Sequence, residues 1–253
     1  MAKVQKRSYE VILKSARSML FRHLCNHLDS KKVLLHLDNG FEKQLFIASL
    51  KNLSDKGNPV RFNNFAYCMR EIIGLILSKY SDDADIKQCK WYEKPDDTEV
   101  TRLQRVIYSI CGGMDRNYVK EVILAIEEED ENIFDETLKI FSKKFNELNK
   151  YTHVRSDNTF NISNDLCEKL SIEVIKLTSD IVSLIDDCRY EIRSHVYEQI
   201  HNAVTDESIR TTLEGLDILS THGYVNYVDI NEYEVSSITS KYIVIQGDGK
   251  AHC

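Results

Sequence analysis

Four arginines are the first residues in this sequence whose type and position suggest chemistry. Arg61, Arg70, Arg102 and Arg105 lie among apolar residues, in two stretches with helical spacing. Arg102 and Arg105 are three residues apart and so share one helix face. Because a half-buried guanidinium needs a carboxylate or a phosphate as partner, two interpretations stay open. The arginines either form ion pairs that tie helices together, or they line a cationic pocket for a phosphodiester or a nucleotide.

The segment 150–155 adds groups that such a pocket would need, a lysine, a hydroxyl, a histidine and a further arginine. An imidazole transfers protons near neutral pH, and a guanidinium stabilises the negative charge that grows on a phosphate in the transition state. We therefore predict a phosphodiester-cleaving site. Its predicted catalytic residues are His153, Arg102 and Arg105. Its predicted phosphate-binding residues are Arg61, Arg70, Lys150 and Arg155.

A second pattern is an arginine followed by a histidine five or six positions later. It occurs at Arg17/His23, Arg22/His27 and Arg189/His195. This spacing resembles that of the metal-independent ribonucleases of the HEPN type. The alternative is a solvated helix face that carries both residues by coincidence. Arg22, His27, Arg189 and His195 are therefore secondary candidates.

Several other kinds of site have no motif in the sequence. It contains no Gly-x-Gly-x-x-Gly, no Walker-type phosphate loop, no Gly-x-Ser-x-Gly and no Cys-x-x-Cys. His23 and His27 share a helix face without a carboxylate in register, and the Glu-x-x-His at Glu198 has no second copy. We therefore expect neither a metal nor a cofactor, and any phosphate chemistry must depend on side-chain cations.

The composition indicates which elements must position these residues. Only nine of the 253 residues are glycine and two are proline, so most of the chain must be helical. The net charge of −7 argues against indiscriminate nucleic-acid binding but leaves room for a local basic groove. Seven dispersed cysteines and the lack of a long apolar run predict a cytoplasmic protein with reduced thiols and no membrane contact.

The hydrophobic spacing predicts a mainly α fold, a multi-helix bundle with a small C-terminal β hairpin or sheet. The helices are expected at about 8–29, 41–53, 64–80, 95–111, 117–128, 132–150, 164–204 and 206–221. The segments at about 224–230, 233–235 and 242–246 are expected to form two or three strands, with 81–97 irregular. We expect an N-terminal helical extension (1–40), a helical core domain (41–222) and a C-terminal β element (223–253).

An ordered series of residues from about 41 to 245 resembles the predicted pPIWI-associating nuclease family. The resemblance is carried by Phe46–Leu53, Asn58–Ile72, Trp91-Tyr92, Thr101–Arg105, Gly112-Gly113, Glu147–His153, Thr221-His222 and Val225–Val235. By position it implies roles for Arg70, Arg102, Arg105 and His153.

The resemblance implies a nucleic-acid-cleaving effector of a bacterial antiviral defence system, a hydrolase with nucleic acid as partner. The alternative is a non-catalytic helical scaffold or sensor that binds a partner protein or a nucleotide signal. An unfinished C-terminal sheet would then offer its edge to partner proteins of a defence locus or to a second copy.

Overall fold

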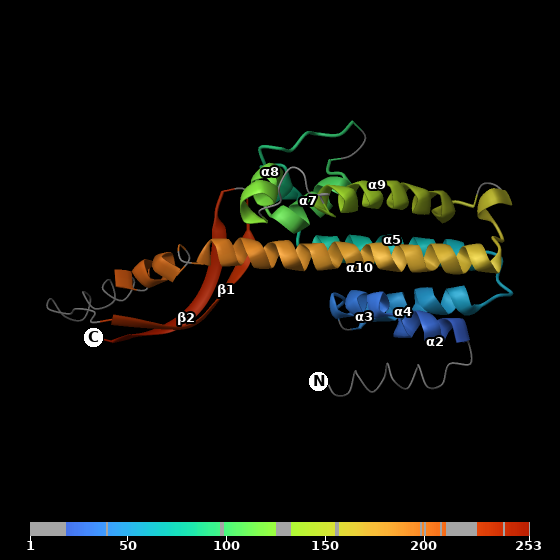
Figure 1. The fold of residues 1–253 in the computed structure, drawn as a ribbon, viewed down its shortest axis with the longest axis horizontal. Coiled ribbons are helices and arrows are strands. Elements are labelled where there is room, and N and C mark those ends of the chain that lie inside the picture. The colour runs from blue at the N-terminus through green and yellow to red at the C-terminus, as the bar shows by residue number, and fades with distance from the viewer. Residues whose placement is uncertain are drawn as a thin grey trace. The chain divides into compact units, whose positions relative to one another are not determined.

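The computed structural model describes residues 19–38, 40–96, 99–124, 133–154, 157–197, 199, 201–207, 209–210, 227–239 and 241–252. It is mainly helical, with a two-stranded antiparallel hairpin near the C-terminus (Figure 1), which confirms the predicted fold class. The chain divides into two compact units. Unit 1 holds residues 1–80 and 131–184, and unit 2 holds residues 81–130 and 185–253. This grouping cuts the chain differently from the three consecutive segments that the sequence suggested.

Unit 1 is a helical bundle around one apolar core. Its described helices are α2 (Met19–Asn26), α3 (Leu28–Leu35), α4 (Phe41–Ser54), α5 (Arg61–Ser78), α9 (Ile133–Thr152) and the first part of α10 (Asn164–His195). In α5 the buried side chains recur every three or four residues, at Phe62, Phe65, Met69, Ile72 and Ile76. That spacing gives the helix one continuous apolar face, which it buries against α4, α9 and α10.

Unit 2 contains α6 (Asp83–Ile86), α7 (Arg102–Cys111), α8 (Arg116–Tyr118), the π-helical turn η1 (Val119–Ile123) and the end of α10. Its apolar cluster consists of Ile86, Cys89, Val100 and Tyr108, with Trp91 and Tyr92 packed against it. The hairpin of β1 (Tyr227–Ile238) and β2 (Ile243–His252) completes this unit.

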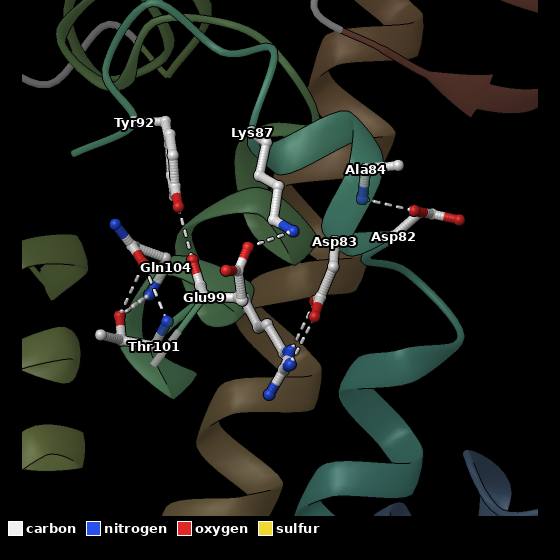
Figure 2. Close-up of polar contacts among 9 residues, drawn as sticks. Asp82, Asp83, Ala84, Lys87, Tyr92, Glu99, Thr101 and Gln104 are labelled. Atoms are coloured by element: carbon white, nitrogen blue, oxygen red, sulfur yellow. Dashed lines mark hydrogen bonds and ion pairs between the residues drawn. The ribbon is translucent and has the colours of Figure 1, made fainter. Parts of the chain in front are cut away.

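Several predicted boundaries were wrong. The stretch 19–35 is broken at His27 into α2 and α3. The helix expected from about residue 95 begins at Arg102, because Thr101 caps it. The helix expected at 117–128 is replaced, in its described part, by α8 and η1. Segment 81–97, expected to be irregular, contains α6, whose N-cap Asp82 accepts a hydrogen bond from the Ala84 amide (Figure 2).

Of the two or three strands expected at the C-terminus, the described residues form two, because the first two expected segments join in one strand. Residues 227–238 form the continuous strand β1, with irregularities in its register to β2 at Ile230/Glu232 and Val235/Ser237. The helix expected at 206–221 lies mostly outside the described residues, as does the start of the first strand. None of the helices within the described ranges is both long enough and apolar enough to cross a membrane.

Candidate functional site

Three helix ends meet at one end of unit 1, where the chain enters α5, leaves α9 and enters α10 (Figure 1). Asn63, 6% exposed, holds them together through its side-chain amide. Its Nδ2 donates to the carbonyl of Tyr151 at 2.8 Å and to that of Thr159 at 3.0 Å. The Asn161 amide also donates to the Pro59 carbonyl at 3.0 Å. The chain is thus anchored at Tyr151, two residues before His153, and again at Thr159 and Asn161.

Arg61 is the most deeply buried of the candidate cations, with 5% of its surface exposed. Its Nη2 donates a hydrogen bond to Oδ1 of Asn164, the exposed first residue of α10. Its Nη1 is buried without a hydrogen-bond partner. Burial raises the pKa of the neighbouring Cys167 thiol, and the positive charge of Arg61 opposes that rise. None of the described carboxylates forms an ion pair with Arg61, so its charge is not neutralised within the described chain.

Arg70 lies two to three turns further along α5 and is half-buried. Its Nη1 donates to Thr152 Oγ1 at 3.0 Å, and Thr152 Oγ1 donates to the Asn149 carbonyl at 2.8 Å. The guanidinium carbon lies 5.6 Å from the centre of the Phe145 ring, within range of a cation–π contact. The Nε is buried without a partner, and none of the described carboxylates pairs with this arginine either.

The remaining candidate residues of this region lie at the surface. Lys150 is exposed on the last turn of α9, and His153 is exposed immediately after that helix. His153 therefore directly follows Thr152, the residue that accepts the hydrogen bond from Arg70. Arg155 lies outside the described residues. We call Arg61, Arg70, Lys150 and His153 the arginine end of unit 1.

Arg102 and Arg105 belong to unit 2, on the first turns of α7. Arg105 donates twice to one carboxylate, from Nε to Asp83 Oδ1 at 2.9 Å and from Nη2 to Asp83 Oδ2 at 2.7 Å (Figure 2). This bidentate hydrogen bonding holds the pKa of Asp83 below its usual range. Arg102 is half-buried. For Arg105, the ion-pair interpretation therefore describes the structure.

Figure 2 shows that the rest of this region of unit 2 is also tied together by polar contacts. Lys87 forms an ion pair with Glu99 at 2.6 Å, and the hydroxyl of Tyr92 donates to the Glu99 carbonyl. Thr101 and Gln104 form a reciprocal capping box at the start of α7. These contacts tie the described residues of the loop between α6 and α7 to one another and to the start of α7.

The secondary candidates occupy two places. Arg22 is exposed on α2, whereas His27 lies at the N-cap of α3, where its Nδ1 is 3.3 Å from Asp29 Oδ2. Arg189 donates through Nε to the Ser109 carbonyl at 2.6 Å, and His195 is exposed at the end of α10. Residues six apart on one α-helix are rotated by about 240°, so Arg189 and His195 do not share a helix face.

A pocket in unit 1 lies elsewhere and has a different chemistry. It is lined by Ile73, Ile76, Leu77, Phe141, Leu177, Thr178, Ile181 and Val182. All eight lining residues are uncharged, so the pocket offers no cation to a phosphate. The hydroxyl of Thr178 donates to the Val174 carbonyl at 2.9 Å. Within the described ranges no group of three or more His, Cys, Asp or Glu residues could hold a metal ion.

Comparison with protein families gives two matches. Residues 34–178 match one model described as predicted pPIWI-associating nuclease, and residues 185–253 match a second model with the same description. Together the two models cover most of the chain. The chain belongs to the predicted pPIWI-associating nuclease family. No curated protein and no solved structure matches it significantly.

The two family models meet within α10, where units 1 and 2 also divide. The first model contains all four residues of the arginine end, together with Arg102 and Arg105. The second contains Arg189, His195 and the hairpin, and Arg22 and His27 precede both. The residues that the two family models match therefore include every primary candidate residue and two of the four secondary ones.

Sequence reasoning missed three residues that shape the arginine end, namely Asn63, Thr152 and Asn164. Each contacts a residue 82 to 103 positions away in the chain. One signal was present in the sequence, since Asn63 lies between Phe62 and Phe65 at the start of an apolar helix, and a buried amide needs partners.

Proposed function

We propose that this protein is a nucleic-acid-cleaving effector of a bacterial antiviral defence system, and that the arginine end of unit 1 is its reaction site. Family membership supports the nuclease class. We choose this site because of the groups that contact Arg61 and Arg70. Both guanidiniums bind only uncharged groups among the described residues, namely Asn164, Cys167, Thr152 and the Phe145 ring.

An unneutralised, partly buried cation attracts a phosphate more strongly than an exposed one, because little water competes for it. Arg61 and Arg70 lie nine residues apart on α5, about half a turn apart around its axis, so Arg61 meets the start of α10 and Arg70 meets the end of α9. The N-terminal ends of α5 and α10 add the positive end of each helix dipole. Lys150 adds a third cation at the surface. This collection of charges fits a phosphodiester backbone that approaches from the exposed side, where His153 lies.

In the proposed reaction His153 acts as general base and then as general acid. It takes the proton from the attacking hydroxyl, of water or of the ribose, as the new P–O bond forms. Arg70 and Lys150 stabilise the charge that grows on the phosphoryl oxygens. The P–O bond to the leaving nucleotide then breaks, and the imidazolium returns its proton to the leaving oxygen.

The test is an incubation of the purified chain with labelled RNA and labelled DNA, with and without a divalent metal. We expect His153→Ala to abolish cleavage and to leave the thermal melt unchanged, since the side chain is exposed. Arg70→Gln should weaken substrate binding, whereas Arg70→Lys should retain part of it. Unaltered cleavage by the His153→Ala protein would remove His153 from the mechanism.

Two matched histidine variants serve as controls. His27→Ala and His195→Ala each remove a histidine that is partly or fully exposed and lies outside the arginine end. We expect both proteins to cleave at the wild-type rate. Loss of cleavage in either control, with cleavage retained in His153→Ala, would transfer the reaction to the corresponding arginine–histidine pair.

The Asp83–Arg105 pair favours a second candidate function, a helical scaffold or sensor without catalysis. Its bidentate geometry is that of an ion pair joining α6 to α7. Under this function the arginine end binds a nucleotide signal or a nucleic acid and does not cleave it. Binding that is lost in Arg70→Gln, together with no cleavage under any condition, would select this second candidate. The family description also makes a pPIWI protein the partner that we propose for either function.

A further inference from the structure

The hairpin of unit 2 is fixed at its turn. Ile238, the last residue of β1, is 4% exposed, and its carbonyl accepts hydrogen bonds from the Gly113 amide at 3.1 Å and the Tyr108 hydroxyl at 3.3 Å. The turn itself is closed by Thr239, whose Oγ1 donates to the Tyr242 carbonyl at 2.8 Å and accepts from the Tyr242 amide at 3.1 Å. The turn end is therefore held against the end of α7.

The far half of β2 has a different environment. The described side chains of Gln246, Asp248 and Lys250 are exposed, and β1 is the strand paired with β2 in the described part of the chain. A two-stranded hairpin is at best marginally stable in water, and unpaired strand edges invite pairing with another chain. Among the described strands, none pairs with the edge of β2 that faces away from β1.

We propose that β2 pairs antiparallel with β2 of a second copy of this chain, so that two hairpins form one four-stranded sheet. The pairing is isologous, with the two-fold axis at Gly249. In this register residue 248 of one copy lies opposite residue 250 of the other, and residue 246 lies opposite residue 252.

The charges on β2 favour both a second copy of β2 as the pairing strand and this register of the two strands. With the axis at Gly249, Asp248 of each copy faces Lys250 of the other, which gives two cross-strand pairs of opposite charge. An axis at residue 248 would instead place Asp248 opposite Asp248, and an axis at residue 250 would place Lys250 opposite Lys250. Glycines at 247 and 249 carry no side chains into the new contact, so the backbones can approach closely.

The outer edge of β1 does not offer this complementarity. β1 contains Asp229, Glu232 and Glu234 and no basic residue, so a copy of itself would meet it with like charges. The edge of β2 has one acidic and one basic residue on the same strand face, two positions apart. A second copy of β2 is therefore the strand that its own edge fits.

The test is sedimentation equilibrium on the full chain and on two single charge reversals. Asp248→Lys places lysine opposite lysine twice, and Lys250→Asp places aspartate opposite aspartate twice. We expect the wild-type chain to dimerise, and each single variant to raise the dimer dissociation constant at least tenfold. An equimolar mixture of the two variants restores both opposite-charge pairs and should dimerise like the wild type, as should the double variant.

Both positions are exposed, and within one hairpin Lys250 lies opposite Asp229. The thermal melt of Asp248→Lys in dilute solution should match the wild-type melt, and that of Lys250→Asp should be slightly lower, because it places two carboxylates opposite each other in the monomer. A wild-type chain that stays monomeric would overturn the proposal. So would a dimer whose dissociation constant is indifferent to both reversals. Failure of the mixture to restore the dimer, after both single variants have lost it, would overturn the register. Because the arginine end lies in unit 1, cleavage by the dimerisation variants is a separate measurement.

Discussion

Arg105 and Asp83 are joined by two parallel hydrogen bonds, of 2.9 and 2.7 Å, that connect the second turn of α7 to the first residue of α6. These two hydrogen bonds occupy the planar edge of the guanidinium, which is the edge that would otherwise bind a phosphate. Arg105 is therefore engaged in a structural contact within its own unit, whereas Arg61 and Arg70 in unit 1 have neutral partners. Arg105 thus fits the ion-pair interpretation, whereas the neutral partners of Arg61 and Arg70 are compatible with the phosphate-binding one.

The Asp83–Arg105 pair should make stability depend on pH in a defined direction. Arg105 lowers the pKa of Asp83, so the pair contributes stability above the unfolded-state pKa of about 3.9. That contribution is lost as the pH falls through the lower folded-state value. We expect Asp83→Asn to reduce the free energy of unfolding by about 0.2–1 kcal/mol at pH 6, since the pair is partly exposed.

Urea unfolding of wild type and Asp83→Asn at a series of pH values between 6 and 2 measures this difference. It should shrink as the pH falls below the unfolded-state value. The exposed ion pair between Lys176 and Asp180, four residues apart on α10, provides a matched control. Removing it with Asp180→Asn should lower the free energy of unfolding by only about 0.3–0.5 kcal/mol. A difference between wild type and Asp83→Asn that grows toward acid pH would contradict the assigned role.

The helices that the sequence predicted best are those whose apolar faces repeat locally. Residues 41–53 and 64–80 were expected from spacing alone, and α4 and α5 lie within three residues of those bounds. The start of α7 was misplaced although Thr101 and Gln104 carry a readable capping-box signal. The break expected between residues 230 and 233 is a register irregularity within β1 instead, because a strand can absorb one extra residue as a bulge.

The candidate site was only partly predictable, for a physical reason. Residue type identifies which side chains can bind phosphate, and the stretch 150–155 could be recognised on that basis. Which arginine meets a carboxylate depends on which helices pack together, and no local pattern encodes it. Asp83 lies 22 positions from Arg105, and Thr152 lies 82 positions from Arg70.

Gly112 should not tolerate a side chain. It ends α7 with a φ of +61°, and a Cβ added there would lie 2.7 Å from Cβ and from Cγ2 of Ile238. We expect Gly112→Ala to destabilise unit 2 by more than about 2 kcal/mol, because an unfavourable backbone conformation and a steric clash act together. The measurement is the thermal melt followed by circular dichroism.

Gly74 is the matched control for that substitution. It lies inside α5, and nothing lies within 4 Å of the position a Cβ would take. Gly74→Ala should therefore stabilise the protein by about 0.5–1 kcal/mol through helix propensity. Equal effects of the two alanine substitutions would show that the contact between Gly112 and Ile238 is not as tight as described.

The buried thiols should react slowly in the native protein. Burial raises the pKa of Cys89 to about 11 and that of Cys188 to about 12. At pH 8 a rise from the ordinary value of about 8.5 to about 11 lowers the thiolate fraction on the order of a hundredfold. We expect iodoacetamide followed by mass spectrometry to label both residues at least that much more slowly than in urea. Equal labelling rates with and without urea would contradict their burial.

Asn63 should prove to be a positioning residue for the arginine end. Its amide nitrogen donates to two backbone carbonyls, of Tyr151 and Thr159, one on each side of His153. Asn63→Asp replaces that donor with a carboxylate oxygen facing two other oxygens in a buried position. We expect a loss of about 2–4 kcal/mol in the free energy of unfolding, since a buried charge is left without a donor. Asn64→Asp, at the exposed neighbouring position on α5, should change it by less than about 0.5 kcal/mol. Chemical denaturation measures the free energy of unfolding of both variants.

If Asn63 also orients His153, conditions in which Asn63→Asp remains folded should show a reduced rate of cleavage with unchanged binding of the labelled substrate. A variant as stable and as active as Asn64→Asp would show that these two hydrogen bonds do not hold the segment in place.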